Sequence, residues 1–211
     1  MKLEVDIFKR LKEFDLRIHF IVEDECVGFM GSSGSGKSMT LKCIAGIETP
    51  DWGRIVYNDK VFYDSERKIN LPPQDRHIGY LFQSYALFDN MDVYHNIECG
   101  LKAHKKNNIQ QRIQDMMELF HISELSQRYP RQLSGGEKQR LALARVFAYE
   151  PDIILLDEPF SALDEDLKED LKKELIRILK KYKKPVLFVS HNQEEVNQIC
   201  QRQYKIRRVI R

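Results

Sequence analysis

A stretch rich in glycine and serine, Gly31 to Ser38, has the residue types and spacing that bind a phosphate. It fits the pattern G-x-x-x-x-G-K-[ST], with an apolar run at 26–30 that reads as a strand before it and a helical pattern at 39–47 after it. In such a loop the backbone N–H groups point inward, and the helix N-terminus adds partial positive charge. We therefore expect Lys37 to reach the β- and γ-phosphates of a nucleotide and the Ser38 hydroxyl to hold Mg²⁺.

The nucleotide contacts predicted from this loop are Gly31, Ser32, Ser33, Gly34, Ser35, Gly36, Lys37, Ser38 and Met39. An ordinary surface loop rich in glycine and serine is the alternative, and the strand–loop–helix context argues against it.

Two adjacent carboxylates follow another apolar run. Asp157 ends the run at 153–156, and Glu158 and Pro159 come next. Ligands bind at the carboxyl ends of buried parallel strands, so Asp157 is predicted to hold Mg²⁺, directly or through water. Glu158 beside it is predicted to orient and deprotonate an attacking water. The alternative is that Asp-Glu-Pro merely ends a strand.

Two further polar residues follow predicted strands. His191 comes after the apolar run 186–190, so it is expected at the same edge of the sheet, where an imidazole can bond both phosphate and water. Gln83 follows the strand pattern at 77–82, and its neutral amide suits both Mg²⁺ and water.

The composition excludes several classes of protein. The chain has 211 residues, a net charge of +2 and four cysteines far apart, so neither a polyanion-binding surface nor a zinc or disulfide framework is indicated. The basic clusters at 102–106, 180–184 and 207–211 are interpreted as solvated surfaces, and no nucleic-acid partner is expected. We find no signal peptide and no segment of about 20 apolar residues that would span a bilayer. These features predict a reducing, cytoplasmic compartment.

Periodicity predicts an α/β chain. Alternating apolar positions at 14–20 and a hairpin at 55–63 indicate β structure near the N-terminus. Residues 93–129 are helical in character, with helical spacing of Ile109, Ile113, Met116, Met117 and Phe120. Helices are then predicted at 137–148 and 164–182, and buried strands at 153–156 and 186–189. The second of these helices is expected to bury one stripe, formed by Leu167, Leu171, Leu175, Ile178 and Tyr182. We expect a mainly parallel core sheet, an N-terminal antiparallel β subdomain and an inserted helical subdomain.

The run Leu133 to Gln139 resembles the LSGGQ signature of ATP-binding cassette (ABC) proteins, with Glu137 at the fifth position. The ordered set of the phosphate loop, Gln83, the signature, Asp157-Glu158, residues 161–164 and His191 resembles that family over nearly the whole chain. The resemblance implies a P-loop ATPase fold of ABC type, with Gln83 as the Q-loop residue, Asp164 as the D-loop residue and His191 as the switch histidine. It also implies that Ser134, Gly135 and Gly136 bind the ATP held by a second copy, in a head-to-tail dimer with two ATP molecules.

The resemblance implies a single nucleotide-binding domain over residues 1–211. Its core would be formed by 1–83 and 135–211, and its helical subdomain by 84–134. Because the chain ends about twenty residues after His191, no C-terminal regulatory domain is expected. The family also stacks an aromatic residue on adenine, for which Phe8 and Phe14 are candidates. Phe14 shares the parity of the apolar strand positions and is expected in the core, so Phe8 is the predicted contact. Asn192 stands where the family often has Asp.

Within the family, the run 71–83 looks like importer ATPases, and residues 61–65 look most like molybdate/tungstate transport ATPases, with the sulfate type close behind. The function implied is ATP hydrolysis that drives solute uptake, with membrane permease subunits as partners and a substrate-binding protein acting indirectly. The chain would then lie at the cytoplasmic face of the membrane. Tyr85, Leu87 and Phe88, next to Gln83, would either dock these subunits or pack internally. The alternatives are a soluble cassette ATPase of DNA or ribosome processes, a cassette that regulates or assembles, and a transporter for another solute.

Overall fold

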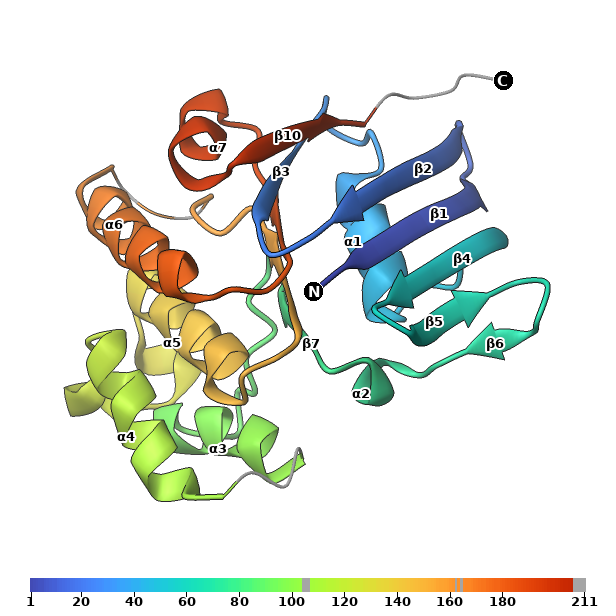
Figure 1. Cartoon of the computed structure of the whole chain (residues 1–211). Helices are drawn as coiled ribbons and strands as arrows, with labels where there is room; N and C mark the ends of the chain where they lie inside the picture. The colour runs from blue at the N-terminus through green and yellow to red at the C-terminus, as the bar shows by residue number, and fades with distance from the viewer. Residues whose placement is uncertain (104–106, 162, 164, 207–211) are drawn as a thin grey trace. The chain divides into compact units, whose positions relative to one another are not determined.

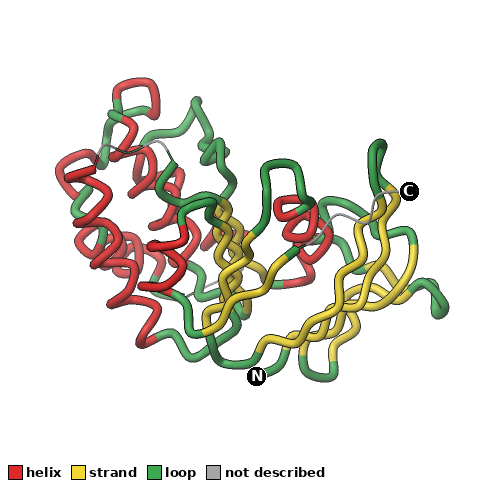
Figure 2. The backbone as a smooth tube through the Cα atoms, turned by 90° about the horizontal axis from the view of Figure 1, so that it is seen from above, coloured by secondary structure: helices red, strands yellow, loops and turns green. Residues whose placement is uncertain are grey.

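The structure, a computed structural model, describes residues 1–103, 107–161, 163 and 165–206. The chain divides into two compact units. The first comprises Met1–Tyr80, Asp152–Glu158 and Tyr182–Arg211, and the second comprises Leu81–Pro151 and Pro159–Lys181. Nearly all strand residues belong to the first unit, and the four longest helices belong to the second (Figure 2).

Figure 1 labels most of the strands and helices, which are numbered in chain order. The strands are β1 (Leu3–Arg10), β2 (Asp15–Val22), β3 (Cys26–Met30), β4 (Trp52–Tyr57), β5 (Lys60–Asp64), β6 (Ile69–Asn70), β7 (Ile78–Leu81), β8 (Ile153–Asp157), β9 (Val186–Val189) and β10 (Arg202–Lys205). The α-helices are α1 (Lys37–Ala45), α2 (Pro73–Arg76), α3 (Val93–Ala103), α4 (Ile109–Leu119), α5 (Gly135–Ala148), α6 (Glu165–Lys181) and α7 (Gln193–Ile199). Two 3₁₀ turns, η1 (Ser123–Leu125) and η2 (Pro130–Gln132), precede α5.

An antiparallel sheet in the order β2-β1-β4-β5-β6 forms part of the first unit. Alternate residues of β2 are buried, as the sequence predicts, and they pair with buried positions of β1, for example Ile7 with Ile18. Phe14 is 6% exposed, which confirms its place in the core. The predicted hairpin is also confirmed, because Tyr57 pairs with Lys60 and Asn58 takes a left-handed turn conformation with φ of 50°.

The second sheet of this unit has the order β10-β3-β9-β8-β7. Strands β10, β3, β9 and β8 run parallel to their neighbours. Every residue of β8 and β9 is buried, which agrees with their uninterrupted apolar sequences. Because the carboxyl ends of parallel strands meet at one edge, the segments that follow β3, β8 and β9 are brought together there.

The second unit is built from helices α3 to α6 (Figure 1). Ile113, Met117 and Phe120 are buried, as their helical spacing predicts. On α6, Leu171 and Leu175 are buried, but Leu167 is 42% exposed, so the predicted stripe was wrong at that position. Leu167 lies in the first turn of α6, beside the start of α5 near Gly136, where less of the unit covers it. Within the described ranges, we find no helix whose length and apolar character would let it cross a membrane.

Candidate nucleotide-binding site

The predicted phosphate loop joins β3 to α1 in the first unit. Its backbone turns where Ser35 N donates to Ser32 O over 3.1 Å. Gly34 and Gly36 have φ of 70° and 100°, values that favour glycine over residues with a side chain. An added Cβ on Gly36 would also lie 2.6 Å from Leu16 of β2. The glycines therefore allow the turn and the close contact between the start of α1 and the antiparallel sheet.

Lys37 is the first residue of α1, and its side chain folds back onto the loop. Its Nζ donates to Gly31 O over 2.8 Å and to Ser32 O over 3.1 Å. An ammonium has three donor hydrogens, so one remains for an acceptor beyond these two carbonyls of the described chain. The side chain is 8% exposed, which places this charge in a poorly hydrated position. The arrangement suits an anion that approaches the loop.

Two observations indicate that the loop is shaped as a cradle. Ser35 Oγ is buried and has no hydrogen-bond partner among the described residues. A Cβ added to Gly31 would lie 2.6 Å from the same oxygen, so only glycine fits there. Buried hydroxyls without partners are rare in folded proteins. The orphaned oxygen and the bare backbone around it fit a polar ligand such as a phosphate. Ser32, Ser33 and Gly34 are exposed, and Met39 lies half-buried in the first turn of α1.

Asp157 ends β8 and lies against the start of α1. Ser38 Oγ donates to its Oδ1 over 3.0 Å, and the Tyr80 hydroxyl donates to its Oδ2 over 3.2 Å. Asp157 is 4% exposed, and burial raises the pKa of this carboxyl, an effect that the hydrogen bonds from Ser38 and Tyr80 oppose. The hydroxyl and carboxylate oxygens of Ser38 and Asp157 form a donor set that Mg²⁺ prefers.

Glu158 and His191 meet at the edge of the parallel sheet, as predicted from the strand ends. His191 Nδ1 lies 2.8 Å from Glu158 Oε2, and Glu158 N donates to Val189 O at the end of β9. Glu158 has φ of 52°, a conformation that costs a residue with a side chain about 1 kcal/mol or more. Such a cost is common at functional positions, because the surrounding structure must hold the residue there.

The predicted signature lies in the second unit, at the start of α5. Ser134 is the N-cap residue: its side chain accepts from Glu137 N, and Glu137 Oε2 accepts from Ser134 N over 2.7 Å. This capping box fixes the first turn, in which Gly135 and Gly136 present backbone without side chains. A Cβ on Gly136 would lie 3.2 Å from Leu167. Asp164, the predicted D-loop residue, falls outside the described residues.

Gln83 also belongs to the second unit, and its side chain is exposed. The loop after it is held by Arg145 of α5, whose Nη2 donates to Tyr85 O over 2.8 Å and whose guanidinium lies 5.3 Å from the centre of the Phe88 ring. Phe88 remains 46% exposed. Tyr85 and Ala86 have φ of 62° and 47°, so this loop keeps an unusual backbone.

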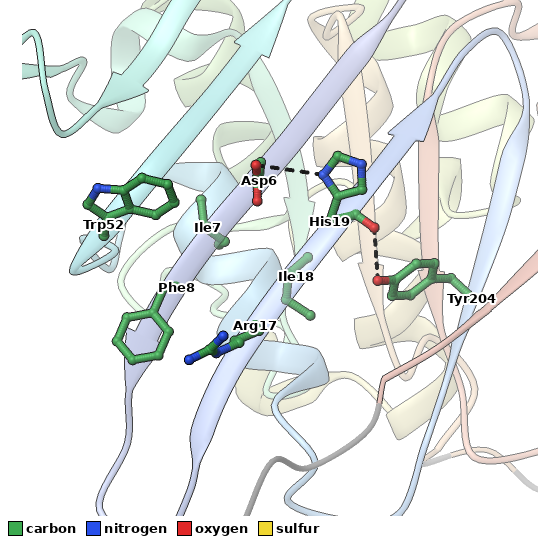
Figure 3. A pocket seen from close by; sticks show the side chains of 8 residues that line it. All are labelled: Asp6, Ile7, Phe8, Arg17, Ile18, His19, Trp52 and Tyr204. Carbon is green, nitrogen blue, oxygen red and sulfur yellow. Dashed lines mark hydrogen bonds and ion pairs between the residues drawn. The ribbon is translucent and has the colours of Figure 1, made fainter.

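Phe8 lies in a pocket of about 540 Å³ on the antiparallel sheet (Figure 3). Phe8 is paired with Arg17 on one side and Trp52 on the other, and the Arg17 guanidinium lies 5.5 Å from its ring centre. Asp6 and His19 form an ion pair above them, and the Tyr204 hydroxyl donates to His19 O over 2.9 Å. Ile7, next to Phe8, faces the buried side of the sheet, and so does Leu16, whose side chain meets Gly36 of the phosphate loop. Phe8 therefore lies on the opposite face of the sheet from this loop.

The structure thus brings Lys37, Ser38, Asp157, Glu158 and His191 together in the first unit, while Gln83 and the signature belong to the second. Two residues near this site were not predicted from the sequence: Tyr80, which bonds Asp157, and Arg76, which bonds the far end of α1. Arg76 donates to the carbonyls of Cys43 and Ile44 over 2.9 and 2.8 Å. Nothing in the local pattern distinguishes Tyr80 from a packing residue, and Arg76 reads as one more charged residue before a strand.

The family profile described as "ABC transporter" matches residues 15–161, which is more than half of the chain. The chain is 40% identical over 195 residues to the sulfate/thiosulfate import ATP-binding protein CysA of Synechococcus elongatus, covering 92% of this chain and 54% of that protein. It is 43% identical over 173 residues to the Fe(3+) ions import ATP-binding protein FbpC 2 of Haemophilus influenzae, covering 81% of this chain and 48% of that protein. The chain therefore spans about half the length of these curated relatives.

Among solved structures, the fold resembles a dimeric post-hydrolysis state of the ATP-binding cassette MJ0796 bound to ADP and Pi. The TM-score is 0.82 and the sequence identity 25%, with 100% of this chain and 98% of that chain covered. The predicted α/β fold of ABC type is thereby confirmed. On its sequence, its fold and its relatives, the chain belongs to the ABC transporter family.

Proposed function

We propose that the chain binds and hydrolyses ATP as the nucleotide-binding subunit of an importer. The observation that carries this proposal is the convergence of the phosphate loop, the Ser38–Asp157 contact and the Glu158–His191 contact at one sheet edge. The importer class is supported by the relatives, whose names describe import ATP-binding proteins. In this proposal both compact units form one nucleotide-binding domain over residues 1–211. The predicted division into a core of 1–83 and 135–211 and a helical part of 84–134 differs from the two compact units, because α5 and α6 belong to the second unit with α3 and α4.

Glu158 is the proposed general base. Its carboxylate is 15% exposed, so it is poorly hydrated and suited to take a proton from a water molecule. In the contact with Glu158 the carboxylate accepts, so Nδ1 of His191 carries the hydrogen. Nε2 lies on the other side of the ring, and it could donate to a terminal phosphate oxygen whenever it also carries a hydrogen. His191 would therefore link the phosphate to the base.

Ser38 and Asp157 are the residues that would hold Mg²⁺, with Gln83 as the proposed further contact. The metal would neutralise charge on the phosphate oxygens when it is bound. Within this chain, the Ser38 hydroxyl and the Asp157 carboxylate supply the oxygens, and Tyr80 orients the carboxylate from the other side. Lys37 adds a fixed positive charge at the loop.

We propose that a second copy completes each site. Its Ser134, Gly135 and Gly136 would contact the ATP bound to the phosphate loop of the first copy, because the start of α5 offers backbone donors and partial positive charge. ATP would then hold two copies together, and loss of the terminal phosphate would release them.

The membrane partners are proposed to dock on the loop after Gln83. Its Phe88 is 46% exposed and lies 5.3 Å from the Arg145 guanidinium, so the loop presents an aromatic side chain that a partner could cover. The chain would then lie at the cytoplasmic face of the membrane, with a substrate-binding protein acting through the permease. For the solute we propose an oxyanion, since relatives are named for sulfate and thiosulfate. Molybdate or tungstate is the solute favoured by residues 61–65, and uptake assays with each anion would distinguish them.

Phe8 is the proposed stacking residue for the adenine base. Its ring lies in a pocket with Trp52 beside it, on the face of the antiparallel sheet opposite to Leu16 and the phosphate loop, so the base would have to pass the edge strand β2 to stack there. Phe8→Ala is expected to weaken ATP binding, and Trp52→Ala is the matched variant in the same pocket. An unchanged affinity for ATP in Phe8→Ala would remove this residue from the site.

The substitution Glu158→Gln tests the proposed chemistry. Gln keeps the size and the hydrogen-bonding carbonyl of the side chain but cannot accept the proton, so turnover should fall by about 10²–10⁴-fold. ATP should still drive dimerisation, measured by size-exclusion chromatography with light scattering. Near-normal hydrolysis by this variant would exclude Glu158 as the base.

Isolation of the chain from native membranes tests the importer class. Recovery with a polytopic membrane subunit is expected. Recovery with ribosomes or DNA would instead favour a soluble cassette ATPase, which is the main alternative function.

A further inference from the structure

A buried hydroxyl–carboxylate pair fastens the turn that carries His191. Ser190 is fully buried and Glu195 is 6% exposed, and Ser190 Oγ lies 2.5 Å from Glu195 Oε2. The backbone N–H of Asn192 donates to the same serine oxygen over 3.0 Å. Ser190 Oγ therefore donates to Glu195 and accepts from Asn192. His191 lies between Ser190 and Asn192 in the sequence, so both of its neighbours are held by hydrogen bonds.

The His191 side chain itself is 75% exposed, so packing does not fix its position. Its imidazole nevertheless lies 2.8 Å from Glu158, across the ends of β8 and β9. The direction of an exposed side chain must then come from its backbone. The backbone around His191 is held by Ser190 before it and by Asn192, the N-cap residue of α7, after it.

We propose that Ser190 and Glu195 are positioning residues for ATP hydrolysis, which hold the His191 turn so that the imidazole stays against Glu158. The inference rests on the proposed roles of Glu158 and His191. Glu195 acts through Ser190, because its carboxylate fixes the hydroxyl hydrogen and leaves the oxygen lone pairs for Asn192. Neither residue is expected to touch the nucleotide.

The test combines a substitution that removes the hydroxyl, Ser190→Ala, with a conservative one, Glu195→Gln. Ser190→Ala removes both hydrogen bonds and should lower kcat by about ten- to hundredfold, with the Kd for ATP unchanged. Glu195→Gln keeps an amide oxygen that can accept from Ser190 and should retain most of the activity. In a His191→Ala background, Ser190→Ala should cause no further loss, because both changes remove the same contact. Equal losses in the two backgrounds, or a normal kcat in Ser190→Ala, would overturn the proposal.

Two measurements separate positioning from stability and from the proposed function. Val196→Ala changes a buried side chain of α7 that lies against Gly28 of β3, so it is the control for lost stability and should leave kcat near normal. The ¹⁵N signals of the His191 ring should move in Ser190→Ala toward those of Glu158→Ala. If the wild-type chain hydrolysed no ATP, the proposed function would fail, while this spectrum would still decide whether Ser190 positions His191. Unmoved ring signals would refute the positioning role.

A separate observation concerns two cysteines that are distant in sequence. Cys26, the first residue of β3, and Cys200, the C-cap residue of α7, have their sulfur atoms 3.4 Å apart. Gln201 joins the same two segments, since its N–H donates to Cys26 O and its side chain accepts from Cys26 N. The hydrogen bond to Cys200 and burial raise the pKa of the Cys26 thiol, while Cys200 is half-buried and open to a small oxidant.

We infer that this pair is a site of oxidative modification, at which a peroxide closes a disulfide between β3 and α7. The peroxide transfers one oxygen to the Cys200 thiol, giving a sulfenic acid and one water. The Cys26 sulfur then attacks the Cys200 sulfur, the S–O bond breaks, and the hydroxyl leaves with the thiol proton as a second water. One peroxide thus converts two thiols into one disulfide. The sulfurs must approach to about 2.0 Å, a small movement for adjacent side chains.

Hydrogen peroxide at one equivalent, followed by alkylation and non-reducing peptide mapping, tests this inference. A peptide linked through Cys26 and Cys200 is expected, together with a higher melting temperature that dithiothreitol reverses. Cys200→Ser should abolish the link, while Cys43→Ser and Cys99→Ser should keep it. Over-oxidation of Cys200 with a free Cys26 thiol, or links between molecules only, would overturn it.

Discussion

Asp157 is proposed to hold Mg²⁺, and its buried carboxylate is expected to lower the stability of the fold. Its carboxylate is buried at the end of β8, where desolvation raises its pKa more than the hydrogen bonds from Ser38 and Tyr80 lower it. The folded pKa therefore lies above that of the unfolded chain. Folding favours the protonated form, so the ionised carboxylate destabilises the protein at every pH above the folded pKa.

Asp157→Asn is accordingly expected to raise the melting temperature at neutral pH in buffer with EDTA. The gain should shrink as pH falls through the folded pKa toward the ordinary value of about 3.9, because both proteins are then uncharged at this position. The same variant should lose the stabilisation that Mg²⁺ with ATP gives the wild type. Calorimetry over a pH series checks both effects. A lower melting temperature at neutral pH would show that the hydrogen bonds outweigh the desolvation.

Lys37 can be tested against a lysine in the same helix. Lys37→Ala should weaken ATP binding by about tenfold or more, since it would remove the proposed charge-assisted contact to phosphate in a poorly hydrated position. Lys42→Ala removes a half-exposed lysine from the last turn of α1 and should change the affinity little. Titration with a fluorescent ATP analogue gives both constants. Equal effects of the two substitutions would mean that the loss reflects net charge and not the loop.

At the scale of elements, α1 is held at both of its ends. Its first turn carries the phosphate loop, and its last carbonyls accept from Arg76, which also bonds Leu71 O and Asn70. Burial lowers the pKa of Arg76 to about 10, so the side chain stays cationic at neutral pH. A cation at the C-terminal end of a helix satisfies its free carbonyls and complements its dipole.

Arg76→Met keeps much of the side-chain length but removes four hydrogen bonds, two of them to the last carbonyls of α1. We expect a loss of about 3 kcal/mol in the free energy of unfolding, measured by urea denaturation. Arg54→Met is the matched control, because Arg54 is exposed and its pair with Asp64 should contribute at most about 1 kcal/mol. A similar small loss of unfolding free energy in both variants would mean that water can replace the hydrogen bonds from Arg76 to the end of α1.

Element types and motif positions could be predicted from this sequence because each rests on a local pattern. The alternation in β2, the uninterrupted β8 and β9, and the strand–loop–helix around Lys37 all appear at short range. The meeting of His191 with Glu158 could also be predicted, since parallel strands end at one edge.

Contacts between distant segments could not be predicted. Three contacts are of this kind: Arg76 with the end of α1, Tyr80 with Asp157, and Cys26 with Cys200. In each case the sequence around one residue does not indicate which distant residue it contacts. The placement of β10 next to β3 is of the same kind, because a short polar strand has no distinctive period. The exposure of Leu167 likewise depends on what covers the start of α6, which its helical spacing alone does not reveal.

At the scale of the whole molecule, the proposed dimer has a consequence that a self-contained site would not have. If each ATP lies between the phosphate loop of one copy and the signature of the other, damage to these two elements affects different halves of a site. A heterodimer of a loop variant and a signature variant would carry both defects in one site and leave the other site intact. Two inactive proteins should therefore complement each other.

Lys37→Ala and Ser134→Asp, each combined with Glu158→Gln, provide the test. Asp can still cap α5, so that helix should stay intact, while its charge repels a phosphate. Neither protein alone should dimerise with ATP. Mixed at equal amounts, they should form heterodimers that retain one ATP, measured by native mass spectrometry. Ser134→Asn, which caps the helix without the charge, should weaken the dimer less. Heterodimers that bind two ATP molecules or none would contradict sites shared between two copies, because only a shared arrangement leaves one intact site per pair.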